Sequence, residues 1–251
     1  MADILLATEG LSKRFGGVIA NAAIDLQVRQ GELHAIIGPN GAGKTTLVAQ
    51  LAGQLRPDDG VIRFAGRDIT DMAAHLRARN GFGRSFQITN VVRELTALDN
   101  VALAVQALQG HSFHFWRPAR SDRTLREPAE GILHKVGLAQ RANVLAGELS
   151  HGEKRALDIA MALAGRPRVL LLDEPLAGMG PEEAPGIISL LATLKGETTI
   201  LLIEHDMDAV FSLAEVVSVL VFGRIIASGA PVEIRQDPEV QRAYLGDEDE
   251  L

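Results

Sequence analysis

The sequence contains no cysteine, which favours a reducing compartment such as the cytoplasm. It also has no stretch close to the roughly 18 uninterrupted apolar residues that a membrane-spanning helix requires. The first residues, Met-Ala-Asp-Ile-Leu-Leu, carry an acid where a secretory signal has a basic start, and no cleavage site follows. These absences predict a cytoplasmic protein that does not cross a bilayer by itself.

A basic surface is missing as well. The formal net charge is −7 at pH 7, and only five of the 25 basic residues are lysines. Proteins that bind nucleic acid through its phosphates carry a basic patch, so nucleic acid is not expected as a partner. The acidic run at residues 247–250 is interpreted as a solvated tail, with a specific partner contact as the alternative.

What the sequence does contain is a regular succession of short apolar runs. Its 251 residues, 47% of them apolar, are enough for one α/β body with an inserted lobe. Because helical stretches fall between the β-rich runs, the order is typical of a layered α/β domain. Strands are predicted over residues 22–28, 33–37, 61–64, 169–172, 198–203, 216–222 and 225–228, and helices near Lys44, Asp71, Pro181 and Asp206.

The middle of the chain has a different pattern. Between residues 96 and 165 the sequence predicts no strand, only helices over 98–108, 121–136 and 151–164. This segment is therefore predicted to be a helical lobe inserted between two parts of the sheet. Near the end of the chain, two strands are predicted to join at Gly223 and Arg224, where glycine supplies the positive φ of a tight hairpin.

A glycine-rich segment at residues 38–46 reads Gly-Pro-Asn-Gly-Ala-Gly-Lys-Thr-Thr. It follows a predicted strand and opens an apolar helix, which is the context in which this pattern binds phosphate. Its glycines allow successive backbone N–H groups to turn toward phosphate oxygens at the positive end of the helix dipole. Lys44 can then reach the β- and γ-phosphates, and the Thr45 hydroxyl can bind Mg²⁺. The alternative is a glycine-rich turn with a solvated lysine.

Two acids, Asp173 and Glu174, come directly after the apolar run Val-Leu-Leu-Leu. Such a run is typical of a buried parallel strand, and acids at its end then lie at the edge of the sheet where ligands bind. Asp173 would hold the Mg²⁺ shell, and Glu174 would orient and deprotonate the attacking water. Taken alone, the pair could also be the polar end of an ordinary strand.

The string Leu-Ser-His-Gly-Glu at residues 149–153 precedes another apolar helix. Ser150 and Glu153 have the spacing of a capping box, in which the two side chains satisfy backbone N–H groups at the helix start. A helix start also attracts anions, so a structural role and a phosphate-binding role are compatible here.

The order and spacing of these segments, together with Gln87 and His205, resemble the ABC ATPases over essentially the whole chain. The resemblance implies an α/β fold: a P-loop ABC ATPase with a RecA-like core, an antiparallel β subdomain and an inserted helical subdomain. The core is then expected at residues 1–95 and 166–246. The helical subdomain with the signature motif is expected at 96–165, and an acidic tail at 247–251.

The same resemblance assigns roles to single residues. It implies that Phe15 stacks on adenine, and that Ser150 and Gly152 reach the γ-phosphate bound by the opposite subunit. Outside the resemblance, Phe15 could be a core residue, Gln87 a surface amide and His205 a capping or buried histidine. The implied ATP-binding residues are Phe15, Gly38, Pro39, Asn40, Gly41, Ala42, Gly43, Lys44, Thr45, Thr46, Ser150, Gly152 and Asp173.

The implied catalytic residues are few. Glu174 corresponds to the catalytic base and His205 to the switch histidine near the γ-phosphate. Gln87 corresponds to the loop glutamine that senses Mg²⁺ and water and joins the core to the helical lobe. With Thr45 and Asp173, Gln87 is also an implied Mg²⁺ ligand.

Two departures from the family pattern are visible. His151 and Glu153 replace the commoner glycine and glutamine of the signature, but phosphate contact through Ser150 and Gly152 survives that change. The segment after the acid pair, Leu-Ala-Gly-Met-Gly, lacks the aspartate often found there. No role across the subunits is therefore assigned to that position.

Further segments resemble the ATP-binding subunits of branched-chain amino acid importers, a subfamily that includes urea and aromatic-acid relatives. They include Glu-Pro-Leu-Ala-Gly-Met-Gly-Pro at 174–181 and Phe-Gly-Arg-Ile-Ile-Ala-Ser-Gly at 222–229. This resemblance implies a peripheral subunit on the cytoplasmic face of the inner membrane that hydrolyses ATP with Mg²⁺ to energise an importer.

The implied partners are a second ATP-binding subunit, which is another copy or a sister chain, and transmembrane permease subunits. A periplasmic solute-binding protein is an indirect partner. Two alternatives stay open: the energy subunit of a lipid or lipopolysaccharide exporter, and an ABC ATPase without a transport role. Members of the latter class usually carry two cassettes or a long coiled-coil insertion, and this sequence has neither.

Overall fold

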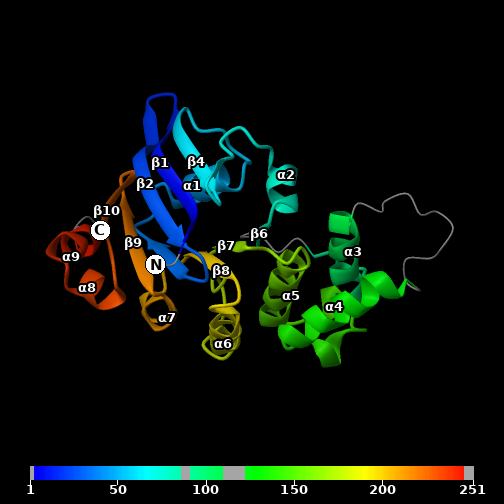
Figure 1. Ribbon diagram of the computed structural model, residues 1–251. Helices are drawn as coiled ribbons and strands as arrows, with labels where there is room; N and C mark the ends of the chain where they lie inside the picture. Colours follow the sequence, from blue (N-terminus) through cyan, green and yellow to red (C-terminus); the bar gives the residue numbers. More distant parts are fainter. Residues whose placement is uncertain (1–2, 86–90, 110–121, 246–251) are drawn as a thin grey trace. The chain divides into compact units, whose positions relative to one another are not determined.

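The computed structural model describes residues 3–85, 91–109 and 122–245 (Figure 1). The chain divides into two compact units. So far as they are described, the first unit is formed by Met1–Arg77, Leu171–Glu174 and Leu194–Leu251, and the second by Ala78–Leu170 and Pro175–Thr193. The boundaries expected for the core, the inserted lobe and the tail stay a prediction.

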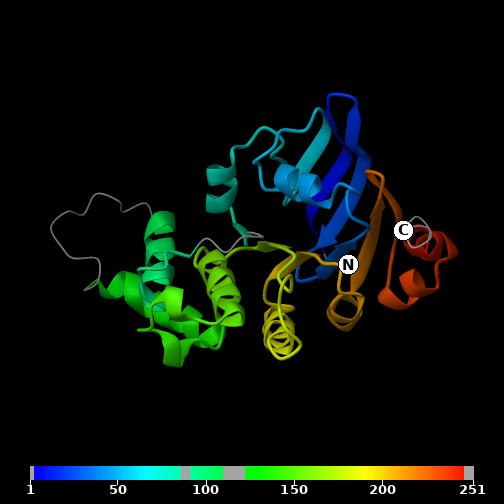
Figure 2. The ribbon, with the colours of Figure 1, turned by 180° about the vertical axis from the view of Figure 1, so that it is seen from behind.

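The first unit contains an antiparallel sheet (Figure 2). Its strands are β1 (Ile4–Phe15), β2 (Val18–Arg29), β4 (Asp59–Phe64) and β5 (Arg67–Asp68), in the order β2-β1-β4-β5. β1 and β2 form a hairpin that places Phe15 opposite Val18. The sequence does not predict β1, because Gly10 has a φ of 61° and the register shifts near it break the regular alternation of side chains.

The first unit also holds most of a second sheet. Its strands are β3 (Leu33–Ile37), β8 (Thr199–Ile203), β9 (Val216–Val221), β10 (Arg224–Gly229) and the later residues of β7 (Val169–Asp173). β3 lies between β8 and β9 and is parallel to both, while β10 is antiparallel to β9 and β7 is next to β8. Every residue of β3, β7 and β8 is buried, as in strands covered on both faces.

The seven strands predicted from the sequence are all present, with small differences at their ends. The expected position of the last hairpin was wrong by one residue. Its turn consists of Phe222 and Gly223, with φ values of 44° and 76°. A two-residue turn of this type needs positive φ at both positions, and only one of the two is a glycine, so composition alone points to the wrong pair.

The helices of the first unit begin close to where the sequence places them. Asp206 caps α7, because its Oδ1 accepts the N–H of Ala209 at 3.0 Å. α2 starts three residues after the predicted Asp71, and the two short C-terminal helices were not predicted. The bounds are α1 (Lys44–Leu51), α2 (Ala74–Arg79), α7 (Met207–Leu213), α8 (Pro231–Gln236) and α9 (Pro238–Leu245).

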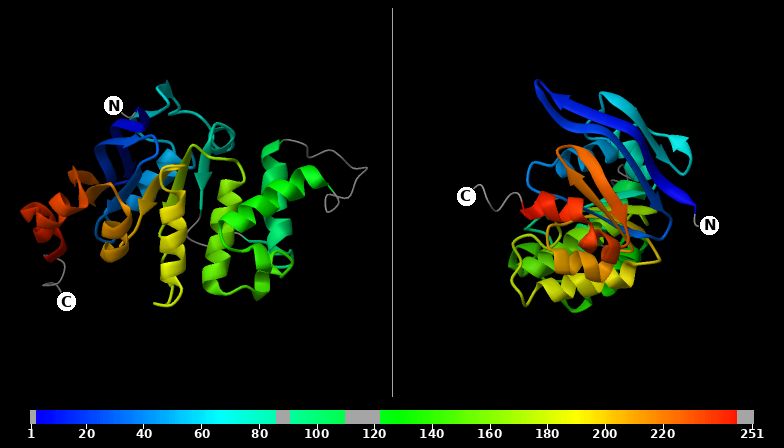
Figure 3. Two further views of the ribbon diagram at one scale, coloured as in Figure 1. Left: turned by 60° about the horizontal axis from the view of Figure 1, so that its bottom comes forward. Right: turned by 90° about the vertical axis from the view of Figure 1, so that its left-hand side faces the viewer.

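The second unit is mainly helical, as predicted for its central segment. It contains α3 (Ala97–Gln109), α4 (Arg123–Lys135), α5 (His151–Leu163), nearly all of α6 (Ala184–Leu194) and the short strand β6 (Phe82–Arg84). α3 packs against α4 and α5 (Figure 3). Among the described residues from 96 to 165 there is no strand. Across the part of the chain that the structure describes, no helix is both long and apolar enough to span a membrane.

Arg77 is a buried cation that fastens α1 in the first unit. Its side chain is only 1% exposed, and its guanidinium donates to the carbonyls of Gln50, Leu51, Ile69, Thr70 and Met72 at 2.7 to 2.9 Å. Gln50 and Leu51 end α1, so the cation lies at the negative end of the helix whose other end carries the glycine-rich loop. Burial lowers the pKa of Arg77 to about 10, so the side chain remains charged at neutral pH.

Replacing Arg77 with methionine is expected to lower the free energy of unfolding by about 3–5 kcal/mol, because five buried carbonyls lose their donors. Urea unfolding followed by circular dichroism measures this change. Arg79→Met is the matched control, because Arg79 is exposed on the same helix. This substitution should change the free energy of unfolding by less than about 0.5 kcal/mol. Equal effects of the two substitutions would contradict the role given to Arg77.

Candidate nucleotide site

The glycine-rich loop lies between β3 and α1, as the sequence predicts. Two of its glycines have no room for a side chain: a Cβ on Gly38 would collide with the carbonyl of Leu220, and one on Gly43 with that of Ala20. Gly43 also has a φ of 104°, which other residues rarely adopt. Gly41, in contrast, faces open space. The loop is therefore held closely on one side and open at Gly41.

Lys44 begins α1 and is 7% exposed. Its ammonium group donates to the carbonyls of Gly38 at 2.6 Å and Pro39 at 2.9 Å. Burial lowers the pKa of Lys44, and the negative charges of Glu174 and Asp173 oppose that shift. The lysine and the acid pair therefore lie within electrostatic reach of one another in the first unit.

The start of α1 is suited to an anion. No side chain caps this helix at Gly43, so its first N–H groups are left for water or a bound anion. Asn40, Gly41 and Thr45 are exposed, whereas Ala42 is buried and Pro39 and Thr46 are partly buried.

Contacts from distant segments hold the loop in place. The Asn21 side-chain amide donates to the carbonyl of Gly43 at 3.2 Å, and the N–H of Gly223 donates to the carbonyl of Ala42 at 2.9 Å. The carbonyl of Gly223 in turn accepts the N–H of Ala22 at 2.8 Å. The hairpin turn between β9 and β10 is thus fastened to both β2 and the loop. Asn21 belongs to no recognisable motif with the loop, so the sequence does not predict its contact with Gly43.

The acid pair ends β7 as predicted. Asp173 is 2% exposed, while Glu174 is partly buried and has a φ of 47°. The Glu174 N–H donates to the carbonyl of Ile203 at 2.9 Å and thereby joins this residue to the end of β8. A non-glycine residue in the left-handed region costs about 1–3 kcal/mol. The surrounding structure therefore holds Glu174 in a strained conformation at the end of β7, as it also holds Phe222 in the last hairpin turn.

His205 is the second residue after β8. Its side chain is 63% exposed, and its N–H donates to Oε2 of Glu204 at 3.1 Å. Glu204 is fully buried and was not singled out from the sequence. The His205 imidazole is exposed, with Nδ1 3.8 Å from Oε2 of Glu204, which excludes the alternative of a buried histidine.

Phe15 ends β1 with 51% of its surface exposed, so it is not a core residue. The ammonium group of Lys13 lies 5.8 Å from the centre of its ring. Asp58 holds this end of the hairpin, because its carboxylate accepts the Lys13 ammonium at 2.6 Å and the Arg14 N–H at 2.7 Å. The hydrogen bond from Lys13 lowers the pKa of Asp58. The exposed ring is positioned to stack on a flat ligand.

The second unit presents the predicted capping box at the start of α5. Ser150 Oγ accepts the N–H of Glu153 at 3.2 Å, and Glu153 Oε2 accepts the N–H of Ser150 at 2.8 Å. Arg141 forms an ion pair with the Glu153 carboxylate at 2.9 Å. The N–H of Gly152 donates to Oε1 of Glu183 at 3.0 Å, a contact that the sequence did not reveal.

Comparison with known proteins agrees with this geometry. The model of the family described as "ABC transporter" matches residues 22–177. The chain belongs to the ABC transporter family. A second family model, described as "Branched-chain amino acid ATP-binding cassette transporter", matches residues 224–250.

Relatives of this ABC ATPase match it along nearly its whole length. The high-affinity branched-chain amino acid transport ATP-binding protein BraF of Pseudomonas aeruginosa is 40% identical over 98% of this chain and 100% of that protein. The ADP conformation of MJ1267, an ATP-binding cassette of an ABC transporter, superposes with a TM-score of 0.86 at 32% identity, covering 97% and 99% of the two chains. A dimeric post-hydrolysis state of the cassette MJ0796 with ADP and Pi gives 0.75 at 25% identity, covering 90% and 99%.

Among the expected site residues of this ABC ATPase, Gln87 lies outside the described residues. The loop residues 38–46, Phe15, Asp173, Glu174 and His205 all belong to the first unit, and Ser150 and Gly152 to the second. Within the part of the chain that is described, no cluster of three side chains suited to a metal ion is present, so any bound Mg²⁺ has to share its shell with nucleotide and water.

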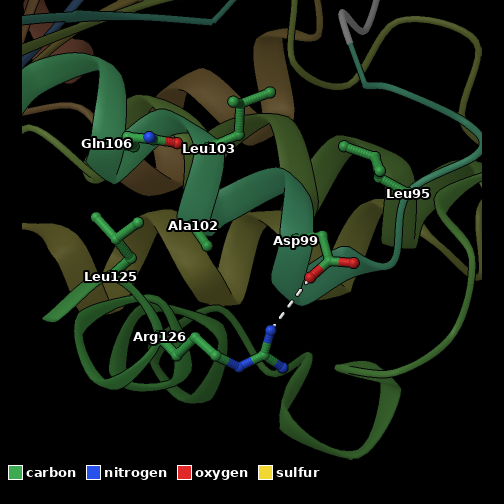
Figure 4. Close-up of a pocket in the computed structure, with 7 residues that line it drawn as sticks. All are labelled: Leu95, Asp99, Ala102, Leu103, Gln106, Leu125 and Arg126. Carbon is green, nitrogen blue, oxygen red and sulfur yellow. Dashed lines mark hydrogen bonds and ion pairs between the residues drawn. The ribbon is translucent and has the colours of Figure 1, made fainter. Parts of the chain in front are cut away.

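The second unit of the ABC ATPase also has a pocket of about 190 Å³ between α3 and α4 (Figure 4). Its lining is mostly apolar, and Leu103 is 46% exposed on its wall. Asp99 and Arg126 form an ion pair at 3.2 Å there, with 12% and 25% of their side chains exposed. The lining residues are Leu95, Asp99, Ala102, Leu103, Gln106, Leu125 and Arg126.

Proposed function

We propose that this ABC ATPase energises a membrane importer for branched-chain amino acids or related small solutes. The observation that carries the proposal is the match of residues 224–250 to the family model of branched-chain amino acid cassettes. The 40% identity to BraF over nearly the full length of both chains supports it. ATP hydrolysis supplies the energy for transport. The chain is a peripheral subunit at the cytoplasmic face of the inner membrane.

Nucleotide binding is assigned to the first unit. The exposed ring of Phe15 stacks on adenine, and the N–H groups of the glycine-rich loop and Lys44 bind the phosphates. The Thr45 hydroxyl and the Asp173 carboxylate offer the oxygen donors that Mg²⁺ prefers, and Gln87 joins them. The uncapped start of α1 and the open space at Gly41 support this assignment, because phosphate oxygens need both.

Hydrolysis is assigned to Glu174. Phosphoryl transfer depends on positioning and on charge stabilisation, so a carboxylate held by the backbone at the end of β7 is suited to orient a water and accept its proton. The bond from the Glu174 N–H to Ile203 fixes that backbone. His205 lies one strand away, after β8, and its exposed imidazole is assigned to the γ-phosphate.

Ser150 and Gly152 are assigned to ATP held by a second ATP-binding subunit, either another copy or a sister chain. The two subunits then enclose two ATP molecules, each between a glycine-rich loop and the start of the opposite α5. The dimeric state of MJ0796 bound to ADP and Pi supports pairing of this kind. ATP binding closes the pair, and hydrolysis reopens it.

The pocket between α3 and α4 is assigned to a transmembrane permease subunit. In this assignment the energy of ATP hydrolysis reaches the bilayer through the permease subunit. An apolar recess with an ion pair at its edge fits a short amphipathic segment that carries both apolar and charged side chains (Figure 4).

Leu103→Glu is expected to reduce permease binding about tenfold or more, because it places a carboxylate on the apolar wall beside Asp99. Co-purification with the permease and permease-stimulated ATP hydrolysis measure the loss. The ATPase activity of the isolated chain should not change. Val232→Glu is the control, since Val232 is 68% exposed on α8 and lies outside the pocket. Normal permease binding by Leu103→Glu would show that the pocket is not part of the interface with the permease.

The transport function itself is tested by purifying the assembly through a tag on this chain. The proposal expects a permease pair that is served by a periplasmic binding protein, and a branched-chain amino acid or related solute in that binding protein. A partner that belongs to a lipid or lipopolysaccharide exporter would contradict the import function while leaving the ATPase assignment intact.

A further inference from the structure

Glu183, which directly precedes α6, has its carboxylate at the start of α5. Its Oε1 accepts the N–H of Gly152 at 3.0 Å. The approach is close, because a Cβ added to Gly152 would lie 3.3 Å from the Cβ of Glu183. Glycine at position 152 therefore makes room for this contact between two segments that are 31 residues apart.

The contact uses a donor that the capping box leaves available. Within the box, Glu153 satisfies the Ser150 N–H and Ser150 Oγ satisfies the Glu153 N–H. The Gly152 N–H takes no part in the box, and Glu183 accepts it. Gly152 is one of the two residues assigned above to the γ-phosphate of the opposite subunit.

The carboxylate is ionised at neutral pH. The Gly152 N–H, with smaller contributions from the Ser150 hydroxyl and His151, holds the pKa of Glu183 below its ordinary value of 4.5. An anion at the positive end of α5 is favourable for the helix, so the contact is stable without ATP.

We propose that Glu183 is a placeholder for the γ-phosphate: it occupies the Gly152 N–H in the free chain and has to release it when ATP closes the pair. The inference rests on the proposed function, because it takes the ligand of these donors to be ATP held by the opposite subunit. One N–H group cannot satisfy two anions, and a carboxylate left beside the γ-phosphate would repel it. Glu183 is thus a positioning residue that sets the ATP concentration at which the pair closes.

The test uses the full chain with Glu174→Gln, so that ATP is not consumed. Dimerisation, of the chain with itself or with the sister subunit that co-purifies with it, is followed by analytical ultracentrifugation as ATP is raised. Adding Glu183→Ala is expected to lower the ATP concentration for half-maximal dimerisation about tenfold. The reason is that the charge-assisted hydrogen bond between Glu183 and the Gly152 N–H no longer competes with the γ-phosphate. Glu183→Gln, which can still accept the Gly152 N–H but is neutral, is expected to give a smaller shift in the same direction.

Glu182→Ala is the matched control, because Glu182 is an exposed acid next in sequence and should leave the midpoint unchanged. The sign of the shift separates the proposal from a merely supporting role. If Glu183 only stabilised the start of α5, its removal would raise the ATP requirement, and that result or an unchanged midpoint would overturn the inference.

The placeholder role of Glu183 and the paired ATPase are contradicted by different results. Dimerisation of Glu174→Gln by ATP, with no shift from Glu183→Ala, contradicts the placeholder alone. No dimerisation of Glu174→Gln at any ATP concentration contradicts the paired ATPase that was proposed, and the placeholder with it. Thermal unfolding of each variant confirms that the compared chains are folded.

Discussion

A chain in which glutamine replaces Glu174 is expected to bind ATP normally and to hydrolyse it about 10²–10⁴-fold more slowly. The amide has the shape of the carboxylate but cannot accept a proton from the attacking water. The backbone at this position is fixed by the N–H bond to Ile203, so the substitution should not disturb the end of β7. Phosphate release measures turnover, and equilibrium dialysis measures ATP binding.

The matched control for this prediction is Glu182→Gln, an exposed acid a few residues further along the chain. Its turnover should equal that of the unaltered protein. If Glu174→Gln hydrolysed ATP at the normal rate, the base would have to be another group, and the assignment of the acid pair would be wrong.

Lys44→Ala is expected to weaken ATP binding by about a hundredfold or more, because the buried cation that was assigned to the phosphates is lost. The ammonium group also donates to the carbonyls of Gly38 and Pro39, so its removal loosens the loop as well. Titration calorimetry with ATP and Mg²⁺ measures the affinity.

Lys195→Ala serves as the comparison, because Lys195 is a partly exposed lysine whose ion pair with Glu215 lies away from the loop. It should bind ATP as the unaltered chain does. Retention of full affinity by Lys44→Ala would mean that the glycine-rich loop is not the phosphate site.

The sequence predicts those parts of the site that short segments determine by themselves. The loop at residues 38–46 combines glycine spacing, a preceding strand and a following helix within one stretch, and the structure has all three. The capping box at Ser150 and Glu153 is equally local, and both of its hydrogen bonds are present. The acids at the end of β7 follow from the apolar run before them.

What the sequence could not reveal depends on contacts between distant segments. Asp58 holds the hairpin that carries Phe15, Asn21 holds Gly43, and Arg77 caps the far end of α1. Each contact forms only when separate elements fold together. The spacing of residues along the chain therefore does not predict it. Glu183 is a further case, since nothing near it in sequence indicates that its carboxylate bonds to Gly152.

Backbone conformation is the second feature that the sequence does not reveal. Bulges interrupt the alternation of side chains in β1, so the sequence does not predict this strand. The last hairpin turn begins one residue earlier than the sequence predicts, because Phe222 adopts a positive φ. The positive φ of Glu174 was likewise unpredictable, since glutamate rarely adopts it. At Phe222 and Glu174 the surrounding structure imposes a conformation that the residue type alone disfavours.

The central claim is that the glycine-rich loop of one chain and the start of α5 of another enclose the same ATP. The absence of cysteine from the sequence allows a direct measurement, because every introduced thiol is unique. Asn40→Cys in this chain is combined with a cysteine at the start of α5 in the pairing subunit, which is His151→Cys where that subunit is a second copy. Both positions of this chain are exposed, and the test uses the Glu174→Gln background. The account predicts a disulfide between the two paired subunits that forms with ATP and Mg²⁺ and not with ADP, whereas an ATP-bound dimer without that disulfide would contradict it.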